Sequence, residues 1–363
     1  MRLPCGYNAW AARRRAPATC PQTSRAPLRP AERRPGPAGV SVSEQRQPVS
    51  LRVSVTDRCD LRCTYCLPPD GAPLATHDDV LRLEEIVAFV GIAERRFGLT
   101  KVHLTGGEPL VRRGIVDLVR MLADAGAADL AMTTNGLRLR EMALALRQAG
   151  LGRVNVSLDT LDAETYRTLT RGGDLALVLD GIAAAGLVGL DPIKFNTVVL
   201  RGTNDHEVAS IARFALERGC AVRFLELMPI GVAQRGYRER FVSSAEVRAQ
   251  VASAFELRSL PPVPGGSSRD YRAVDADGRE GVVGFISPCT EPFCAGCRRL
   301  RLTATGRLLG CLARAEGPQV RSLLRDGAPD AEDRLIEAIE EALHLKRYDR
   351  RFDEQRLMGR VGG

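Results

Sequence analysis

Between residues 51 and 226 the sequence alternates between short apolar runs and longer segments with helical periodicity. Six runs are typical of buried strands, and helix-like patterns fill the five intervals; the runs are 51–56, 101–104, 129–133, 153–158, 193–199 and 221–226, and the helical segments are 82–96, 112–125, 139–149, 175–187 and 205–218. Strands that alternate with helices pair in parallel. Six units are too few to close an eight-stranded barrel. The sequence therefore predicts an α/β fold with an open, partial (β/α)6 TIM-like barrel whose active-site groups lie at the carboxyl ends of the strands.

The alternation stops near residue 243, and a smaller α+β region is expected beyond it. A helix at 243–255 leads to a Pro- and Gly-rich loop, and short strand-like runs and a last helix follow, at 270–274, 281–286, 299–303, 307–311 and about 329–345. We expect three parts: a disordered basic extension over 1–48, a core barrel over 49–242, and a C-terminal region over 243–363.

The net charge of +8 is concentrated at the N-terminus. Residues 1–48 hold nine Arg and two Glu, which account for +7 of it. The rest of the chain is almost neutral and aromatic residues make up only 5%, so we expect no nucleic-acid partner. No charge-free run approaches a membrane span, so no membrane partner is expected either. The prolines of the extension favour an unstructured segment over a mitochondrial transit helix, and with it a cytoplasmic location.

Three of the ten cysteines, Cys59, Cys63 and Cys66, lie within eight residues directly after the first strand run. Each iron of a 4Fe–4S cluster takes one further ligand, so three thiolates leave one iron open to bind a small molecule. A zinc site completed by His77 or His103 is the alternative, but zinc sites more often use paired C-x2-C units. This first cysteine set therefore favours a reactive cluster at the mouth of the barrel.

A second cysteine set consists of Cys294, Cys297 and Cys311. Taken alone, its spacing fits either zinc or an iron–sulfur cluster, and three ligands again leave a metal position open. Cys289 is an alternative ligand, although a small buried residue is the more ordinary interpretation. Cys220, just before an apolar strand, is expected to pack in the core.

The first cysteine set, with Tyr65 before its last member, resembles the signature of the radical S-adenosylmethionine (SAM) superfamily. Further segments match motifs of that superfamily; they are Gly106-Gly107-Glu108-Pro109, Thr133-Thr134-Asn135-Gly136, Asn155–Asp159, Lys194–Thr197 and Glu226–Pro229. Three further features narrow the match to one family within the superfamily: the second cysteine set, Arg299-Leu300-Arg301 and the terminal Gly362-Gly363. Together they resemble the GTP 3',8-cyclase family of molybdenum cofactor biosynthesis.

The resemblance implies two 4Fe–4S clusters, one on each cysteine set. The open iron of the first would bind SAM, and the open iron of the second would contact the guanine of GTP. Positions that line SAM in the family correspond to Tyr65, Gly107, Ser157 and Met228. Positions that contact GTP correspond to Arg52, His103, Thr133, Lys194, Arg299 and Arg301, of which Arg299 and Arg301 also serve catalysis. The terminal glycines match a tail that reaches the active site.

The resemblance also implies the reaction. Reductive cleavage of SAM yields a 5'-deoxyadenosyl radical, which removes the 3' hydrogen of GTP, and the ribose radical closes onto guanine C8. The product is (8S)-3',8-cyclo-7,8-dihydroguanosine 5'-triphosphate, and the enzyme is a lyase. Implied partners are an electron donor of unknown identity, cyclic pyranopterin monophosphate synthase downstream, and a second copy in a homodimer. The alternatives are a divergent radical SAM paralogue with another substrate and a zinc-binding structural protein.

Two positions depart from the pattern of that family. His103 stands where the family usually has a substrate-contacting Arg, and Arg298 follows Cys297 where the family usually has Asn. A His side chain is shorter and is often neutral at pH 7. We therefore predict that Arg298 partly replaces the charge that is missing at His103.

Overall fold

The computed structural model describes residues 48–127, 129–314 and 316–346. The N-terminal extension up to residue 47 and the terminal Gly362 and Gly363 lie outside the described residues. Each of the six expected strands is present, with its ends shifted by at most two residues; they are β1 (Val49–Ser54), β2 (Leu99–Thr105), β3 (Leu130–Thr134), β4 (Arg153–Ser157), β5 (Lys194–Val199) and β6 (Ala221–Glu226). They pair in parallel and in sequence order, which confirms the predicted (β/α)6 core.

The sheet extends beyond these six strands because C-terminal strands join both of its edges. Strand β10 (Arg299–Leu302) pairs in parallel with β1, and β9 (Glu280–Ile286) pairs in parallel with β6. Outside these lie antiparallel strands: β11 (Leu308–Leu309) on one edge, and β8 (Arg269–Val274) with β7 (Glu256–Ser259) on the other. The resulting eleven-stranded sheet is open, in the order β11-β10-β1-β2-β3-β4-β5-β6-β9-β8-β7. The C-terminal strands thus belong to the same sheet as the barrel strands.

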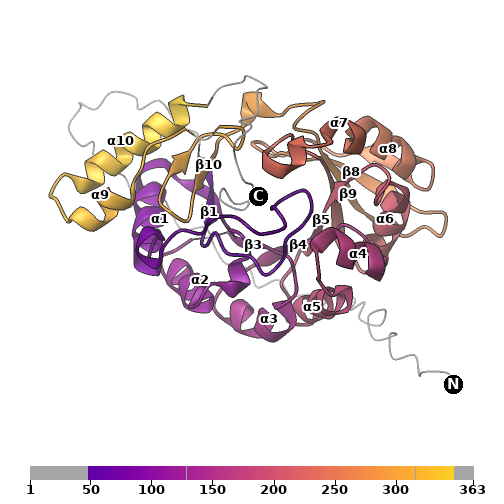
Figure 1. The fold of residues 1–363 in the computed structure, drawn as a ribbon, viewed down its shortest axis with the longest axis horizontal. Coiled ribbons are helices and arrows are strands. Elements are labelled where there is room, and N and C mark those ends of the chain that lie inside the picture. Colours follow the sequence, from indigo (N-terminus) through magenta and orange to yellow (C-terminus); the bar gives the residue numbers. More distant parts are fainter. Residues whose placement is uncertain (1–47, 128, 315, 347–363) are drawn as a thin grey trace, which may run out of the picture. The chain divides into compact units, whose positions relative to one another are not determined.

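Helices fill the intervals between the parallel strands and lie outside the sheet (Figure 1). The five expected helices form as α1 (Leu83–Phe97), α2 (Ile115–Asp124), α3 (Leu139–Gln148), α5 (Leu175–Leu187) and α6 (Val208–Glu217). The sequence analysis missed α4 (Ala163–Thr170), which Asp162 caps by accepting a hydrogen bond from the backbone N–H of Thr165. A short helix, α7 (Tyr237–Arg240), follows β6, and the C-terminal region adds α8 (Ser244–Ala252), α9 (Arg321–Asp326) and α10 (Ala331–His344).

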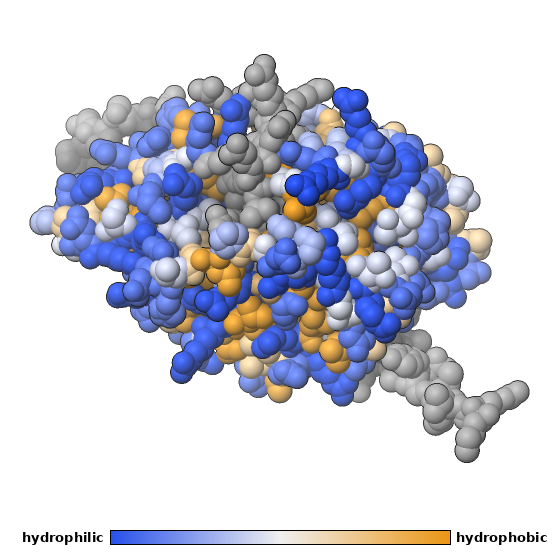
Figure 2. Space-filling model, in the orientation of Figure 1, coloured by the Kyte–Doolittle hydropathy of each residue, from blue (hydrophilic) through white to orange (hydrophobic). Residues whose placement is uncertain are grey.

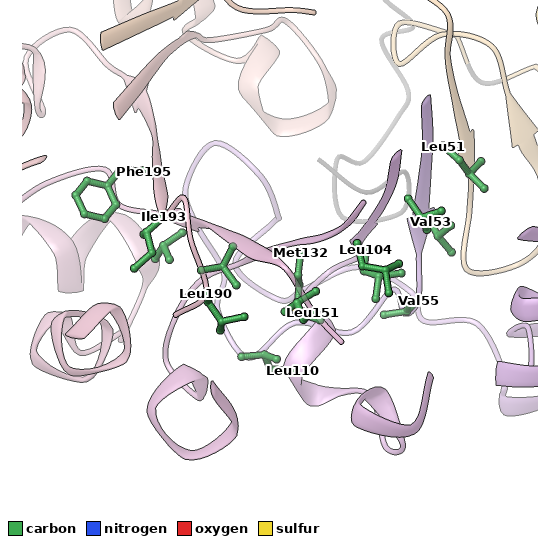
Figure 3. Packing of buried hydrophobic residues seen from close by; sticks show 14 of the residues in the cluster. Leu51, Val53, Val55, Leu104, Leu110, Met132, Leu151, Leu190, Ile193 and Phe195 are labelled. Atoms are coloured by element: carbon green, nitrogen blue, oxygen red, sulfur yellow. The ribbon is translucent and has the colours of Figure 1, made fainter. Parts of the chain in front are cut away.

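The two faces of the sheet have opposite character because side chains alternate along each strand. Leu51, Val53, Leu104 and Met132 are fully buried and gather between strands and helices, as Figure 3 shows. Cys220 joins this core, as expected. The inner face carries polar and charged side chains instead, so it leaves room for a site rather than a second core.

Polar and charged side chains cover most of the molecular face seen in Figure 2. Among the described helices, none combines the length and the apolar character that a bilayer crossing requires.

Candidate active site

The inner face of the sheet borders a cavity of about 870 Å³. Its lining comes from strands β1 to β6 and β8 to β10 and from the loops around them. A volume of this size falls at the upper end of the usual range for small-molecule sites. Most of the sequence-predicted site residues line it: Arg52, Cys59, Cys63, Tyr65, Cys66, Gly107, His103, Thr133, Ser157, Lys194, Met228, Arg299 and Arg301.

The first cysteine set occupies the loop after β1, where the sequence analysis placed it. The loop is fastened to the end of α4, since the backbone N–H of Arg62 donates to Thr170 at 3.1 Å and that of Thr64 donates to Leu169 at 2.9 Å. A turn closes the set, because the N–H of Cys66 donates to the carbonyl of Cys63 at 2.9 Å. Burial raises the pKa of the Cys59 thiol to about 11. Iron binding would therefore have to displace a proton from this thiol.

Two glycines hold this loop against the end of β2. The N–H of Gly107 donates to Thr56 and that of Glu108 donates to Arg58, each at 2.8 Å. A Cβ on Gly107 would lie 2.2 Å from the carbonyl oxygen of Arg58, and one on Gly106 would lie 2.6 Å from that of Thr56. Only glycine permits this approach of two backbones. The Gly106-Gly107 motif therefore positions Arg58, which directly precedes Cys59.

The carboxylate of Glu108 points back into the protein and joins two loops. It accepts hydrogen bonds from the N–H of Leu110 at 2.9 Å, the hydroxyl of Thr134 at 2.8 Å and the N–H of Asn135 at 2.6 Å. Burial raises its pKa to about 7, although these three donors act in the opposite direction. Glu108 thus ties the glycine motif to the loop after β3.

Tyr65 is fixed by a buried aspartate at the end of β4. The Tyr65 hydroxyl donates to Asp159 Oδ2 at 2.6 Å, and Asp159 Oδ1 accepts from the N–H of Val198 at 2.9 Å. Burial raises the pKa of Asp159 to about 6, against the effect of both donors. The orientation of the aromatic residue inside the first cysteine set therefore depends on a carboxylate 94 positions later.

The second cysteine set lies beside the same cavity without lining it. Cys294 begins a short turn. Cys297 lies two residues before the start of β10, and Cys311 lies two residues after the end of β11. Neighbouring residues of these loops line the cavity: Phe293, Gly296, Arg298 and Leu312. Burial alone would raise the pKa of Cys297, but the nearby Lys346 ammonium and the backbone at Arg299 hold it below its ordinary value.

The two cysteine sets suit clusters in their chemistry and placement. All six thiols are unpaired by disulfides and only partly exposed. Within the described ranges, no three His, Cys, Asp or Glu side chains converge on one point as ligands of a single ion would. In a cubane cluster each thiolate binds a different iron, so three thiols supply ligands for three of the four irons. Cys289 is half-buried rather than buried, and its thiol donates to the carbonyl of Leu227 at 3.5 Å.

Arginines from two strands meet on one side of the cavity. In the parallel pairing of β1 with β10, Arg52 is the register partner of Arg301 and Ser50 that of Arg299. Burial lowers the pKa of Arg52, and Arg301 and Arg299 lower it further. Arg299 and Arg301 are two positions apart on β10 and therefore share one face of the strand, and both line the cavity. An anion bound between these guanidinium groups would reduce their mutual repulsion.

More cations line the cavity than the sequence analysis identified. Lys101 on β2 and Arg223 on β6 were missed, together with Arg153 on β4. The alternation of side chains along a strand could have identified Lys101. It lies two positions before His103 on the same strand, so both side chains are on the same face of the sheet. Burial, followed by neighbouring arginines, lowers the pKa of Lys101 and of Lys194 to about 8 each.

Acidic side chains neutralise two of these cations. Arg153 donates two hydrogen bonds to Asp129, at 2.7 and 3.1 Å. Arg223 lies 3.6 Å from Asp270. Two of the cations that line the cavity thus have an acidic partner.

His103 occupies a buried position beside this cationic group. Its Nε2 lies 2.7 Å from the hydroxyl of Thr133, and it is the register partner of Arg52. Burial, and then Arg52 and Lys101, hold the pKa of His103 well below its ordinary value. His103 is thus a neutral hydrogen-bonding group among cations. Arg298 lines the same cavity, and its buried Nε has no hydrogen-bond partner among the residues that the structure describes.

Several further polar atoms at the cavity wall are buried and have no hydrogen-bond partner within the described part of the chain. They are Ser50 Oγ, Asn155 Oδ1, Ser268 Oγ and Asp270 Oδ1. A buried polar atom without a partner costs about 1–3 kcal/mol. Their gathering at one cavity points to a polar ligand that completes them.

Two family models match the chain in succession. The model described as the radical SAM superfamily matches residues 53–215, and the model described as molybdenum cofactor synthesis C matches residues 220–352. The first covers the end of β1 and the strands β2 to β5, and the second covers β6 and the C-terminal strands.

Similar proteins match over most of the chain. A protein of Moorella thermoacetica named GTP 3',8-cyclase is 42% identical over 325 residues, which cover 88% of this chain and 98% of that protein. A GTP 3',8-cyclase of Pseudomonas putida strain W619 is 47% identical over 307 residues, which cover 84% of this chain and 90% of that protein.

Solved structures share the fold at low sequence identity. The structure of Streptococcus suis SuiB bound to S-adenosylmethionine matches with a TM-score of 0.54 and 15% identity, over 74% of this chain and 61% of that one. The chain thus spans less than two thirds of the length of SuiB, and the likeness concerns the α/β architecture.

Proposed function

Because this chain belongs to the GTP 3',8-cyclase family of the radical SAM superfamily, we propose that it performs the first step of molybdenum cofactor biosynthesis. The substrate is GTP, and the product is (8S)-3',8-cyclo-7,8-dihydroguanosine 5'-triphosphate. In GTP the C3'–H bond breaks and a bond from C3' to guanine C8 forms. The hydrogen atom removed from C3' would leave in 5'-deoxyadenosine, and one electron and one proton would complete the 7,8-dihydroguanine ring. Reductive cleavage of SAM would consume a further electron, so an external donor must supply two electrons per turnover. We assign the enzyme to the lyases.

One observation supports this proposal above the others. The loop of the first cysteine set and cations from β1, β2, β5, β6 and β10 all line a single cavity. A site for a radical cofactor alone would need no such group of cations. A nucleoside triphosphate needs several cations, because its phosphate groups carry several negative charges. Guanidinium and ammonium groups bind these charges instead of repelling one another.

Arg52, Arg299 and Arg301 are proposed to bind the triphosphate and to position the ribose. Forked guanidinium donors suit phosphate oxygens, and the β1–β10 register places these donors side by side. Lys194 contributes a point charge from the opposite part of the lining. His103 and Thr133 form a hydrogen-bonded pair that offers a neutral donor to the substrate.

The loop after β1 is proposed to hold a 4Fe–4S cluster through Cys59, Cys63 and Cys66, with Tyr65, Gly107, Ser157 and Met228 lining SAM. When bound, the cluster and SAM supply the one-electron chemistry that removes a hydrogen atom from carbon. The protein holds Tyr65 through Asp159 and holds the loop through Gly107. These contacts fix the reacting groups relative to the cationic wall.

A second 4Fe–4S cluster is proposed on Cys294, Cys297 and Cys311, with its open iron toward the guanine. The loops that carry these cysteines line the cavity at Phe293, Gly296, Arg298 and Leu312. The product would then pass to cyclic pyranopterin monophosphate synthase, and association into a homodimer is part of the proposal. A divergent substrate is the competing proposal, because His103 and Arg298 depart from the family pattern.

Turnover under anaerobic conditions tests the function. The protein is reconstituted with iron and sulfide and mixed with GTP, SAM and dithionite, and 5'-deoxyadenosine and the cyclised nucleotide are quantified together. Cys63→Ala should abolish both products, because one ligand of the first cluster is lost. Cys220→Ala is the matched control, since Cys220 is a buried core residue outside the cavity, and it should form both products.

Each other result has a definite meaning. Formation of 5'-deoxyadenosine without the cyclised nucleotide would retain the radical chemistry and reject GTP as the substrate. Protein that binds zinc without acid-labile sulfide, and forms neither product, would support a structural zinc protein instead.

A further inference from the structure

Lys346 lies at the second cysteine set, although it is more than thirty positions from the nearest of these cysteines in sequence. Its ammonium donates to Cys297 Sγ at 3.5 Å and to the carbonyl oxygen of Arg299 at 2.7 Å. One side chain thus contacts both an expected cluster ligand and the backbone of an expected substrate-binding residue. Lys346 lies two residues beyond the end of α10 and is half-buried.

The helix that carries Lys346 is packed tightly against the loop of Cys311. A Cβ on Gly310 would lie 2.1 Å from the carbonyl oxygen of Ala342 and 3.1 Å from Cγ of Lys346. The glycine directly before Cys311 therefore admits α10 at backbone distance. On the far side α10 is fixed in the core by buried side chains, Leu335, Ala338, Ile339 and Ala342. The position of the ammonium is set by this packing as well as by its two hydrogen bonds.

Lysine is rare in this chain, and its placement is selective. The chain has 52 basic residues, of which only Lys101, Lys194 and Lys346 are lysines. The first two line the cavity, and the third lies at the second cysteine set. An ammonium presents three donors from one small charged centre, which suits convergence on a sulfur and a carbonyl, whereas a planar guanidinium does not have this geometry.

We propose that Lys346 is a positioning residue for the second cluster: its ammonium donates a charge-assisted hydrogen bond to the Cys297 thiolate, fixes the start of β10, and stabilises the reduced form of the cluster. The inference depends on the proposed function, because it requires a cluster at this cysteine set. Hydrogen bonds to sulfur and local charge are two of the properties that set the potential of an iron–sulfur cluster. One-electron reduction adds a negative charge to the cluster, so a nearby cation favours it and raises the potential.

The test measures the potential of the second cluster by itself. The full chain with Cys59, Cys63 and Cys66 all changed to Ala retains only the second set of ligands. After anaerobic reconstitution, iron and sulfide are counted and the cluster is titrated with dithionite and mediators under electron paramagnetic resonance. Lys346→Met is then added to this background, because Met keeps an unbranched apolar stem beside Gly310 and removes the ammonium.

Lys346→Met should lower the potential, with about a tenfold change in the ratio of reduced to oxidised cluster at a fixed potential, or about 59 mV for one electron. Lys346→Gln should shift it in the same direction and serves if the Met variant does not fold. The matched control is Arg95→Met, since Arg95 is an exposed cation that pairs with Glu332 on α10 at 2.9 Å and touches neither cysteine set. Its potential should equal that of the parent.

Three results would overturn the inference. A second cluster whose potential is unchanged in Lys346→Met and Lys346→Gln would reject the role of Lys346 and leave the proposed function intact. An equal shift in Arg95→Met would mean that loosening α10, rather than losing the ammonium, changes the potential. Failure of the parent triple variant to bind iron and sulfide would reject the second cluster, and with it both this inference and that part of the proposed function.

Discussion

The contact between Gly107 and the cysteine loop yields a quantitative prediction for Gly107→Ala. The added methyl group would lie 2.2 Å from the carbonyl oxygen of Arg58, 2.5 Å from its carbonyl carbon and 3.1 Å from the carbonyl carbon of Asp57. All three atoms belong to the backbone, so no side-chain rotation relieves the overlap. The two segments must separate by about 1 Å to restore an ordinary contact.

Two costs follow from this separation. Overpacking a closely packed site costs about 1–3 kcal/mol. The hydrogen bonds that Gly107 and Glu108 donate across the contact, each 2.8 Å long, would also lengthen, at about 1 kcal/mol each. We expect Gly107→Ala to lower the free energy of unfolding by about 3–5 kcal/mol. Because Arg58 directly precedes Cys59, the same movement should reduce the iron content after reconstitution.

Urea unfolding of the iron-free protein measures the first effect, and iron per chain measures the second. Gly91→Ala is the matched control, since a Cβ on this helical glycine meets only Nη1 of Arg95 at 3.4 Å. It should stabilise the protein by about 0.5–1 kcal/mol, because alanine loses less backbone entropy in a helix. A Gly107→Ala protein within about 0.5 kcal/mol of the parent, with full iron content, would refute the reasoning.

Three further predictions concern charge. The pKa values of Lys101 and Lys194 are both about 8 in the free protein, so each is about half protonated at pH 8. A triphosphate raises both pKa values, and GTP binding at pH 8 should therefore take up about one proton. Calorimetry in buffers of different ionisation enthalpy measures this uptake, and zero uptake would contradict the prediction. Burial raises the pKa of Glu108 to about 7, so this group ionises at lower pH in the unfolded chain than in the folded protein. The iron-free protein should therefore lose up to about 3 kcal/mol of stability as the pH rises from 4.5 to 7. Glu108→Gln should flatten this part of the curve of unfolding free energy against pH, and parallel curves for the two proteins would count against the assignment. If Arg298 compensates for the neutral His103, Arg298→Ala should weaken GTP binding about tenfold, or about 1.4 kcal/mol; unchanged affinity in Arg298→Ala beside weaker binding in Arg299→Ala would reject the compensation.

Local sequence patterns predicted the elements well where a pattern is repeated along the chain. The apolar runs of β1 to β6 and the helical periods between them are local signals, and the structure places each strand within two residues of its expected range. Short elements were less predictable. Helix α4 has a hydrogen-bonded cap at Asp162, but its eight residues contain too little periodicity to distinguish it from a loop.

The candidate site was predictable in part, for a related reason. The first cysteine set was found from its spacing, and the glycine motif was found from the resemblance to the radical SAM superfamily. Lys101 and Arg223 were missed because a single basic residue on a strand is most often a surface residue. Their exposure to a cavity depends on which face of the sheet is closed by helices, and that is a property of the whole sheet.

The sequence by itself determined the order of strands and helices, the two cysteine sets and the near-neutral body of the chain. Only the tertiary structure decided that β10 pairs with β1, so that Arg301 becomes the register partner of Arg52 across almost 250 residues. It also decided that Lys346 meets Cys297. The physical reason is that periodicity reports whether a segment is buried on one face, whereas pairing at a sheet edge depends on which distant segment satisfies its backbone hydrogen bonds and fits its side chains.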